Sequence, residues 1–276
     1  MTAAFDLIIR NARDTGGLPI SVGIVDGRIA ALGPALEGRG AEYDAGGHIL
    51  GPGLHDHHCH LLATAARLES VDLTDCRTED AAIARLRAGI GAPGPWTRAF
   101  GYDERVAGLP DRDLLDRWLP NQPLRMQDRT GAYWLLNSAG IAILGKVPLP
   151  ACVERDASGR PTGRIWRGDA WLRERIGGDP PSLVALGKRL ARWGVTGVTD
   201  AGASNGAVEA KLLAGALPQR LVIMGTEALP KGEGYTIGAV KLLLDENDLP
   251  PIDQIVDRIA AARGLNRNVA AHCATL

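Results

Sequence analysis

From residue 181 onwards, the sequence alternates short apolar runs with segments that have a helical period. The segment from Leu183 to Trp193 places apolar residues at 183, 186, 190 and 193, which is the spacing of a half-buried helix. Strand-like apolar runs follow near 195–201, 220–225, 238–244 and 269–273. Because helical segments of about ten residues separate these runs, we expect a parallel sheet or barrel.

A further strand-like segment at 54–60 brings the expected barrel strands to five. A closed barrel of this kind needs eight. We therefore predict an α/β fold, namely a partial (β/α)8 barrel of the TIM type with a small N-terminal β-domain and an α+β insertion. We also expect the chain to be truncated.

The order of the elements predicts four parts: 1–50, the β-domain; 51–93, the first barrel strand and a helix capped by Thr78; 94–180, the inserted α+β subdomain; and 181–276, barrel strands two to five. The β-domain is predicted to be a β-meander, because an alternating run ends at Asp26-Gly27, a dipeptide that favours a hairpin turn. The inserted subdomain is rich in turns and includes a predicted helix over 133–144.

Composition narrows the class of protein. The chain has 276 residues and a formal net charge of −1, which gives no electrostatic reason to expect nucleic acid or an anionic membrane as a partner. No run of about 18 apolar residues is present, and we expect no signal peptide. The four cysteines are scattered without a C-x-x-C pair, so we expect reduced thiols in a cytoplasmic protein.

The segment Gly51–His60 carries the strongest chemical signal. His58 and His60 stand at i and i+2, so both imidazoles lie on the same face of a strand. Two neutral imidazoles aimed at one point are a good start to a zinc-type site. By the same alternation, we expect His57 to point away from them and Cys59 to be a small core residue.

Two later strands carry further candidate ligands. Lys241 lies in an otherwise apolar strand, where a lysine is costly unless it snorkels, pairs or is neutralised. The alternative is a lysine that reaches out from a strand end. His272 lies near the C-terminal end of the last strand, where barrel active sites are built. The alternative is a core histidine bonded to backbone. Cys273, beside it, is expected in the core.

Several N-terminal stretches resemble the start of amidohydrolase-superfamily enzymes. These stretches are Phe5–Ala12, Val22–Gly33, Tyr43–Leu50 and the Pro-Gly-Leu-x-Asp-x-His-x-His pattern that ends at His60, with Asp56 in its expected place. Such chains open with a small β-domain and enter a metal-bearing TIM barrel. The resemblance implies one or two divalent metal ions, with zinc expected, and a lysine carboxylated by CO2 to a bridging carbamate. The implied metal ligands are His58, His60, Lys241 and His272.

The insertion resembles one branch of the superfamily, amidohydrolase-3, which includes N-substituted formamide deformylases. The matching segments are Gly101-Tyr-Asp103, Gly131-Ala-Tyr-Trp-Leu-Leu-Asn-Ser138 and Asp156-Ala-Ser-Gly-Arg-Pro-Thr-Gly163. The second segment departs from the pattern, with Ala132 where that branch often has a histidine. Tyr102, Arg129 and Trp134 could line a substrate pocket, and packing within the subdomain is the alternative for each.

The resemblance implies a metal-dependent amidohydrolase that hydrolyses a carbon–nitrogen bond of an amide, formamide or cyclic amide through a metal-bound hydroxide. The family's general-base aspartate would lie beyond residue 276, so the catalytic base is unknown. Two alternatives remain open: a truncated half-enzyme without activity of its own, and a deaminase on the same scaffold. The expected partners are a small-molecule substrate and either a missing C-terminal half or a complementing chain.

Overall fold

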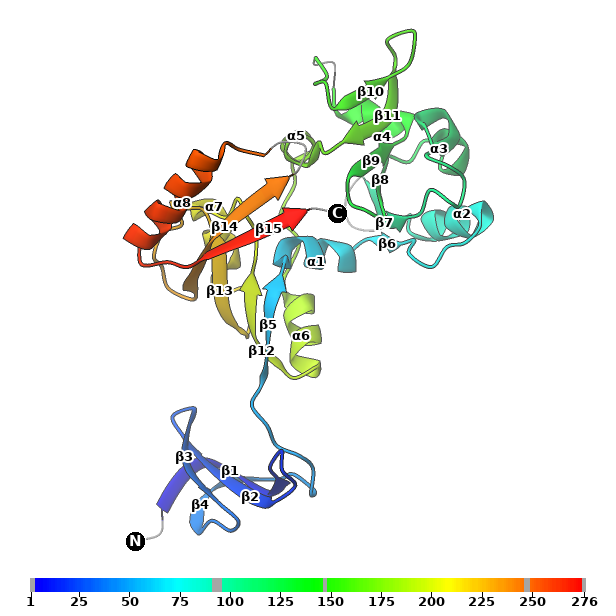
Figure 1. The fold of residues 1–276 in the computed structure, drawn as a ribbon. Coiled ribbons are helices and arrows are strands. Elements are labelled where there is room, and N and C mark those ends of the chain that lie inside the picture. Colours follow the sequence, from blue (N-terminus) through cyan, green and yellow to red (C-terminus); the bar gives the residue numbers. More distant parts are fainter. Residues whose placement is uncertain (1–2, 91–95, 146–147, 246–248, 275–276) are drawn as a thin grey trace. The chain divides into compact units, whose positions relative to one another are not determined.

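The computed structural model describes residues 3–90, 96–145, 148–245 and 249–274 (Figure 1). The chain divides into two compact units, Met1–Leu54 and His55–Leu276. The described strands form three sheets, of four, six and five strands. Within the described residues, no helix has the length and apolar character needed to cross a membrane.

The first unit is built on a four-stranded sheet with the order β3-β2-β1-β4. Its strands are β1 (Ala3–Arg13), β2 (Pro19–Val25), β3 (Arg28–Gly33) and β4 (Gly38–Asp44). Strands β2 and β3 pair antiparallel, and the φ angles of Asp26 and Gly27 between them are 50° and 68°. Left-handed conformation at both central positions is what a type I′ hairpin requires. The predicted hairpin is confirmed.

The five-stranded sheet has the order β15-β14-β13-β12-β5 (Figure 1). Its strands are β5 (Leu54–Cys59), β12 (Val195–Asp200), β13 (Arg220–Gly225), β14 (Thr236–Asp245) and β15 (Val269–Ala274). Strands β12 to β15 pair parallel to one another. These are the five predicted barrel strands, and the curled parallel sheet that they form confirms a partial TIM-type fold.

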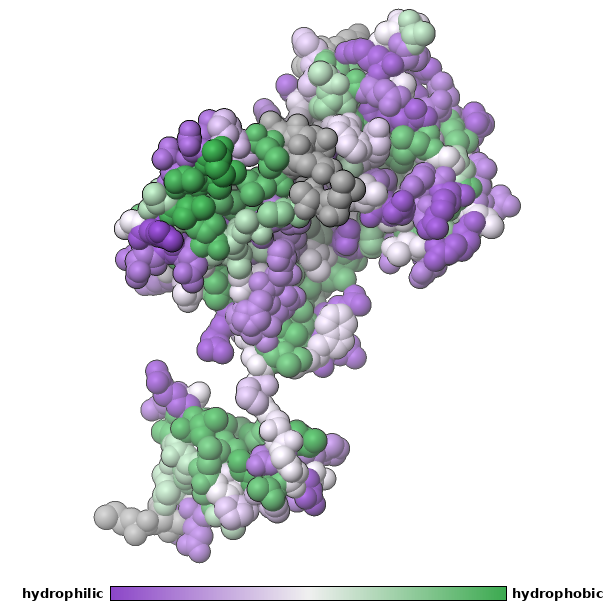
Figure 2. Space-filling model, in the orientation of Figure 1, coloured by the Kyte–Doolittle hydropathy of each residue, from purple (hydrophilic) through white to green (hydrophobic). Residues whose placement is uncertain are grey.

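Helices cover one face of this sheet. They are α1 (Leu61–Leu68), α6 (Val184–Arg192), α7 (Ala207–Leu213) and α8 (Ile252–Gly264). Leu186 and Leu190 of α6 are buried in one cluster with strand residues, which confirms the amphipathic helix predicted there. On α8, Ile252 and Val256 are 69% and 54% exposed, and Figure 2 shows apolar surface over this helix.

Alternation along the strands separates the helix-covered face from the opposite face. Val198 of β12, with Leu221 and Ile223 of β13, packs among the helices. Val240 and Leu242 of β14 pack against α8. Residues between these positions point to the other face, which is the interior of a closed barrel. Such interior residues include Thr199, Val222, Met224 and Lys241.

The six-stranded sheet is mixed and has the order β10-β11-β9-β8-β7-β6. Its strands are β6 (Val71–Asp72), β7 (Thr97–Tyr102), β8 (Leu124–Asp128), β9 (Tyr133–Leu136), β10 (Val153–Arg155) and β11 (Pro161–Trp166). Its helices are α2 (Glu79–Ala88), α3 (Arg112–Trp118), α4 (Ser138–Ile143) and α5 (Asp169–Ile176). The Oγ1 of Thr78 accepts a hydrogen bond from the backbone N–H of Ala81, so the predicted cap of α2 is confirmed.

The helix predicted over 133–144 is wrong in its first half. Residues Tyr133–Leu136 form strand β9, where Trp134 is the register partner of Gln127 and of Ile165. Aromatic and branched side chains favour a pleated surface with neighbours on both sides. The helix starts only at Ser138, after Asn137 caps it by accepting a hydrogen bond from the N–H of Gly140 at 2.9 Å.

Candidate metal centre

His58 and His60 lie side by side at the end of β5. Their ring centroids are 5.5 Å apart with an interplanar angle of 76°. His60 is the residue before α1, and its side chain makes no capping hydrogen bond to that helix. The end of the strand therefore presents two imidazoles together, as the i, i+2 spacing predicts.

The pKa of His60 responds to the charges of the other predicted ligands. Desolvation lowers the pKa of its imidazole, and the Asp200 carboxylate opposes that shift. The positive charges of His58, Lys241 and His272 lower the pKa further. Side chains from β5, β14 and β15 thus act on one imidazole. The lowered pKa favours the neutral form, which is the form that binds a metal ion.

Lys241 is buried on the interior face of β14. It is 5% exposed and lies between Val240 and Leu242, which pack outward against α8. No carboxylate in the described part of the chain forms an ion pair with its ammonium group. A buried amine without a counter-ion is costly, and a metal site that uses the lysine as a carbamate would remove that cost.

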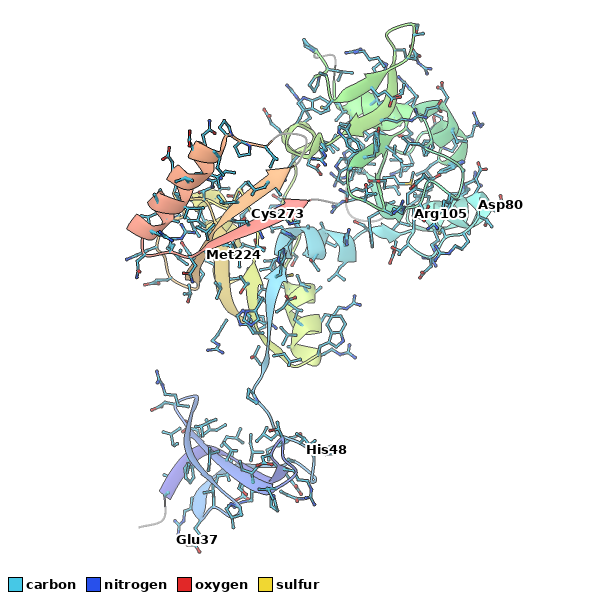
Figure 3. The ribbon with its side chains drawn as sticks, viewed as in Figure 1. Glu37, His48, Asp80, Arg105, Met224 and Cys273 are labelled. Carbon is cyan, nitrogen blue, oxygen red and sulfur yellow. The ribbon has the colours of Figure 1, made fainter. Side chains whose placement is uncertain are left out.

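His272 lies on β15 directly opposite Leu243 of β14. Val269, three residues earlier, packs on the helix-covered side, so alternation places His272 on the interior face with Lys241. Cys273, labelled in Figure 3, is exposed. The prediction that Cys273 is a core residue is therefore wrong, because β15 is an edge strand of the described sheet.

His55 and His57 also lie on the interior face. The Nε2 of His55 is 2.8 Å from the Oγ1 of Thr199, and the rings of His55 and His57 stack with centroids 4.3 Å apart. Both rings line one pocket with Val222 and Met224, the latter labelled in Figure 3. Desolvation lowers the pKa of His55, and the charge of His57 lowers it further.

Asp56 explains why strict alternation fails in β5. Its Oδ1 accepts a hydrogen bond from the backbone N–H of His58 at 3.0 Å, a local contact that competes with the regular strand. Cys59 packs outward in the helix-side cluster, although it has the same parity as the inward-facing His57. The regular alternation of inward and outward side chains is therefore interrupted between His57 and Cys59. The prediction that His57 points away from His58 and His60 is wrong.

Asp200 supports the start of α1 from the neighbouring strand. Its Oδ2 accepts a hydrogen bond from the N–H of Leu61 at 2.8 Å, and its Oδ1 accepts one from the Nδ2 of Asn205 at 2.7 Å. The carboxylate is 4% exposed. Because both oxygens of Asp200 accept hydrogen bonds from these N–H groups, the role of the carboxylate is to position the backbone beside His60. In the sequence, Asp200 is recognisable only as a carboxylate at the end of an apolar strand, and a carboxylate at that place is equally typical of an ordinary turn.

The three candidate substrate residues each have a partner inside the insertion. Tyr102 is 1% exposed, and its hydroxyl donates to the carbonyl of Gly108 at 2.8 Å. Burial raises the pKa of Tyr102 to about 12. The Nε1 of Trp134 donates to Asp169 at 2.8 Å, and Arg129 forms an exposed ion pair. These contacts fit the packing alternative for each residue.

The donor types fit a divalent ion of the zinc class, since they are three imidazoles and a lysine. Within the described ranges, no group of three or more His, Cys, Asp or Glu side chains is placed so that it could hold a metal ion. The fit is therefore one of donor chemistry and of convergence on a single face. Carboxylation of Lys241 would add the anionic oxygens that this set lacks.

The curled parallel sheet and its covering helices define an α/β chain built on part of a TIM-type barrel. Two solved structures share this fold, an uncharacterized metal-dependent hydrolase from Pyrococcus furiosus and one from Pyrococcus horikoshii OT3. The TM-scores are 0.68 and 0.70, with 20% and 19% identity. The alignments cover 97% of this chain in both cases, and 67% and 65% of those chains.

A sequence model of the amidohydrolase family matches residues 41–253, and the chain belongs to that family. It is 32% identical over 192 residues to an N-substituted formamide deformylase from Arthrobacter pascens, a match that covers 60% of this chain and 35% of that protein. It is 26% identical over 225 residues to the Arabidopsis thaliana protein LONG AFTER FAR-RED 3, with 71% and 38% covered. The match thus spans little more than a third of either relative.

Proposed function

We propose that this chain carries the metal-binding half of a hydrolase that cleaves a carbon–nitrogen bond in a small amide, formamide or cyclic amide. The observation that carries the proposal is the pair of imidazoles of His58 and His60, whose ring centroids are 5.5 Å apart, in the same parallel sheet as the buried Lys241. Membership of the amidohydrolase family supports the class of reaction. The similarity to a formamide deformylase supports a substrate with an N-acyl or N-formyl group.

The metal ligands that we propose are His58, His60, Lys241 and His272. Bound there, one or two zinc-like ions would polarise the substrate carbonyl and lower the pKa of water, so that hydroxide is available near neutral pH. His60 contributes a neutral imidazole, because desolvation and neighbouring cations disfavour its charged form. Asp200 holds the backbone of Leu61 and so limits movement of the adjacent imidazole.

Lys241 would act as a carbamate. Its uncharged amine attacks CO2, the new N–C bond forms, and the nitrogen releases one proton to water. The product is an anion with two oxygen donors. It would replace a buried cation that has no carboxylate partner in the described ranges with a group that two cations can neutralise.

We propose that further strands complete the site, either in a longer form of this chain or from a complementing chain. A closed barrel of this kind has eight strands, whereas the described sheet has five. The general-base carboxylate would come from those strands. The four cysteines are unpaired, and we propose a cytoplasmic setting, in which thiols stay reduced.

Metal analysis combined with an amide-hydrolysis assay tests this function. The protein is dialysed against zinc with and without bicarbonate, and its metal content is compared with amine release from N-formyl, N-acyl and cyclic amide substrates. We expect zinc to be retained and bicarbonate to increase the amount. Ammonia release from amino-heterocycles without amide hydrolysis would favour the deaminase alternative. Failure to retain zinc would refute the proposal, and zinc retention without turnover would identify a half-enzyme that needs its remaining strands.

A further inference from the structure

Two arginines of the insertion stand directly beside each other on neighbouring strands. Arg98 of β7 is the register partner of Arg125 of β8. Both residues are half-buried, and the Nε of each is buried without a hydrogen-bond partner. Like charges directly opposite on a sheet destabilise it, and an unsatisfied buried donor adds to the cost. The arrangement therefore needs a reason beyond packing.

Each guanidinium lies near a buried tryptophan ring. The Cζ of Arg98 is 5.7 Å from the ring centroid of Trp134, and the Cζ of Arg125 is 5.7 Å from that of Trp96. Both tryptophans are 7% exposed. A cation–π contact uses the flat face of the guanidinium, so the N–H donors at its edge stay available. The rings hold two sets of donors in place without satisfying them.

Neither guanidinium has an anionic partner in the part of the chain that the structure describes. Glu69 and Asp169 act on Arg98 only at a distance, and Asp169 already accepts a hydrogen bond from Trp134. Burial lowers the pKa of Arg125 to about 10, and the charge of Arg98 also lowers it. Both side chains remain cationic at neutral pH.

Other arginines of the same subdomain do have carboxylate partners. The ion pairs are Arg105 with Asp103, Arg129 with Glu104, Arg160 with Asp113, and Arg164 with Glu154. Four arginines of the subdomain thus have carboxylate partners. Arg98 and Arg125 differ from these four in facing each other with the Nε of each buried and without a hydrogen-bond partner.

We propose that Arg98 and Arg125 form an oxyanion-binding site that takes the carboxylate or phosphate group of a small molecule. An oxyanion between the two guanidiniums would accept hydrogen bonds from both edges and separate two like charges. Charge-assisted bonds of this kind are roughly twice as strong as neutral ones. The site lies on the inserted sheet, and its ligand could be a group of the substrate or a separate effector. The proposal does not depend on a metal ion.

Anion titration of the purified chain tests the site. Inorganic phosphate and acetate are added at constant ionic strength, with chloride as the balancing anion, while tryptophan fluorescence and Tm are followed. We expect one of the two anions to give a saturable fluorescence change and a rise in Tm. Saturation by phosphate alone would assign a phosphate ligand, and saturation by acetate alone a carboxylate ligand. Failure of both anions to exceed the chloride control would overturn the proposal.

Two variants and one matched control locate the binding. Arg125→Met and Arg98→Met should weaken anion binding at least about tenfold, which corresponds to about 1.4 kcal/mol. Arg160→Met removes a guanidinium that is paired with Asp113, and it should bind as the wild type does. Arg125→Lys keeps a cation without the planar fork, so it should fold and still bind more weakly. Wild-type affinity in both methionine variants would refute the site.

Stability in anion-free buffer gives a second readout. Because Arg125→Met removes a like-charge contact and an unsatisfied buried donor, we expect its Tm to be at or above the wild-type value when no anion is present. The increment in Tm that the anion produces should disappear at the same time. A purely structural arginine would behave in the opposite way, since its loss would lower Tm equally with and without the anion.

Discussion

The Oδ2 of Asp200 accepts a hydrogen bond of 2.8 Å from the backbone N–H of Leu61. This bond ties the end of β12 to the first residue of α1. Because Leu61 directly follows His60, the carboxylate restrains the backbone that carries one of the proposed metal ligands. Asn205 donates to the other oxygen of the same carboxylate, so Asp200 is itself held in place.

Replacing Asp200 with alanine should therefore affect both stability and metal binding. The N–H of Leu61 and the amide of Asn205 would lose a charged acceptor, so we expect the free energy of unfolding to fall by about 3 kcal/mol. Zinc affinity should fall by about 10- to 100-fold, as it does when groups that orient metal ligands are removed. Urea unfolding and zinc competition measure the two effects. Asp179→Ala, at an exposed position, is the control and should change neither.

Lys241→Met should separate the structural and the chemical roles of this lysine. Without metal, the variant should be as stable as the wild type or more stable by about 1–3 kcal/mol, because methionine avoids burying a charge. With zinc, the wild type should take up more metal when bicarbonate is added, whereas the variant should not respond. Lys211→Met, on the exposed side of α7, serves as control. An equal response to bicarbonate in both variants would exclude the carbamate.

Gly197→Ala should disturb His55. A Cβ atom at position 197 would overlap the Nδ1 of His55, so the ring would lose its contact with Thr199. We expect the free energy of unfolding to fall by about 1–3 kcal/mol, the usual cost of overpacking. In a His55→Ala background, the same glycine substitution should cost much less, and a double-mutant cycle measures the difference. Equal costs in both backgrounds would show that His55 is not the clashing group.

Asp103 should give the insertion a stability that depends on acidic pH. Hydrogen bonds from the side chain and then the backbone N–H of Arg105 hold the pKa of this carboxyl well below its usual range. Because the folded-state pKa lies below the unfolded value of about 4, the stabilisation is fully present above about pH 4. It is lost as the pH falls toward the folded value.

In Asp103→Asn, the free energy of unfolding should depend less on pH between about pH 4 and pH 2. The slope should decrease by an amount that corresponds to the uptake of up to one proton on unfolding. Chemical unfolding at several pH values measures the slope. Asp179→Asn should leave the slope as in the wild type. If Asp103→Asn did so too, Asp103 would not be the titrating group.

The sequence predicted the strands of the partial barrel and placed Lys241 inside one of them. Apolar runs mark buried parallel strands, and alternation then assigns inward and outward positions. The rule failed at His57, because a side-chain contact between Asp56 and the backbone of His58 changes the local geometry. It also failed at Cys273, which lies exposed on an edge strand of the described sheet. The periodicity of apolar residues shows neither the hydrogen bond at Asp56 nor how well a strand is covered.

The insertion was harder to predict for a similar reason. The segment from Tyr133 to Leu136 has apolar residues compatible with a helix, and its pairing with β8 and β11 decides for a strand. The pairing of Arg98 with Arg125 depends on register, since 27 positions separate them in the chain. An arginine inside an apolar strand with no acidic residue at i±2 is a pattern that could have singled out Arg98 and Arg125 in the sequence. The pattern does not indicate which arginine lies opposite which.

The turn contact at Asp56 has a consequence for how this protein can diverge. Around this contact, His55 and His57 line a pocket with Val222 and Met224, whereas His58 and His60 are the proposed metal ligands. Replacement of His57 can therefore reshape the pocket that it lines while Cys59 stays anchored among the helices. The shape of that pocket and the proposed metal ligation can thus change independently, because different histidines of this short segment contribute to each.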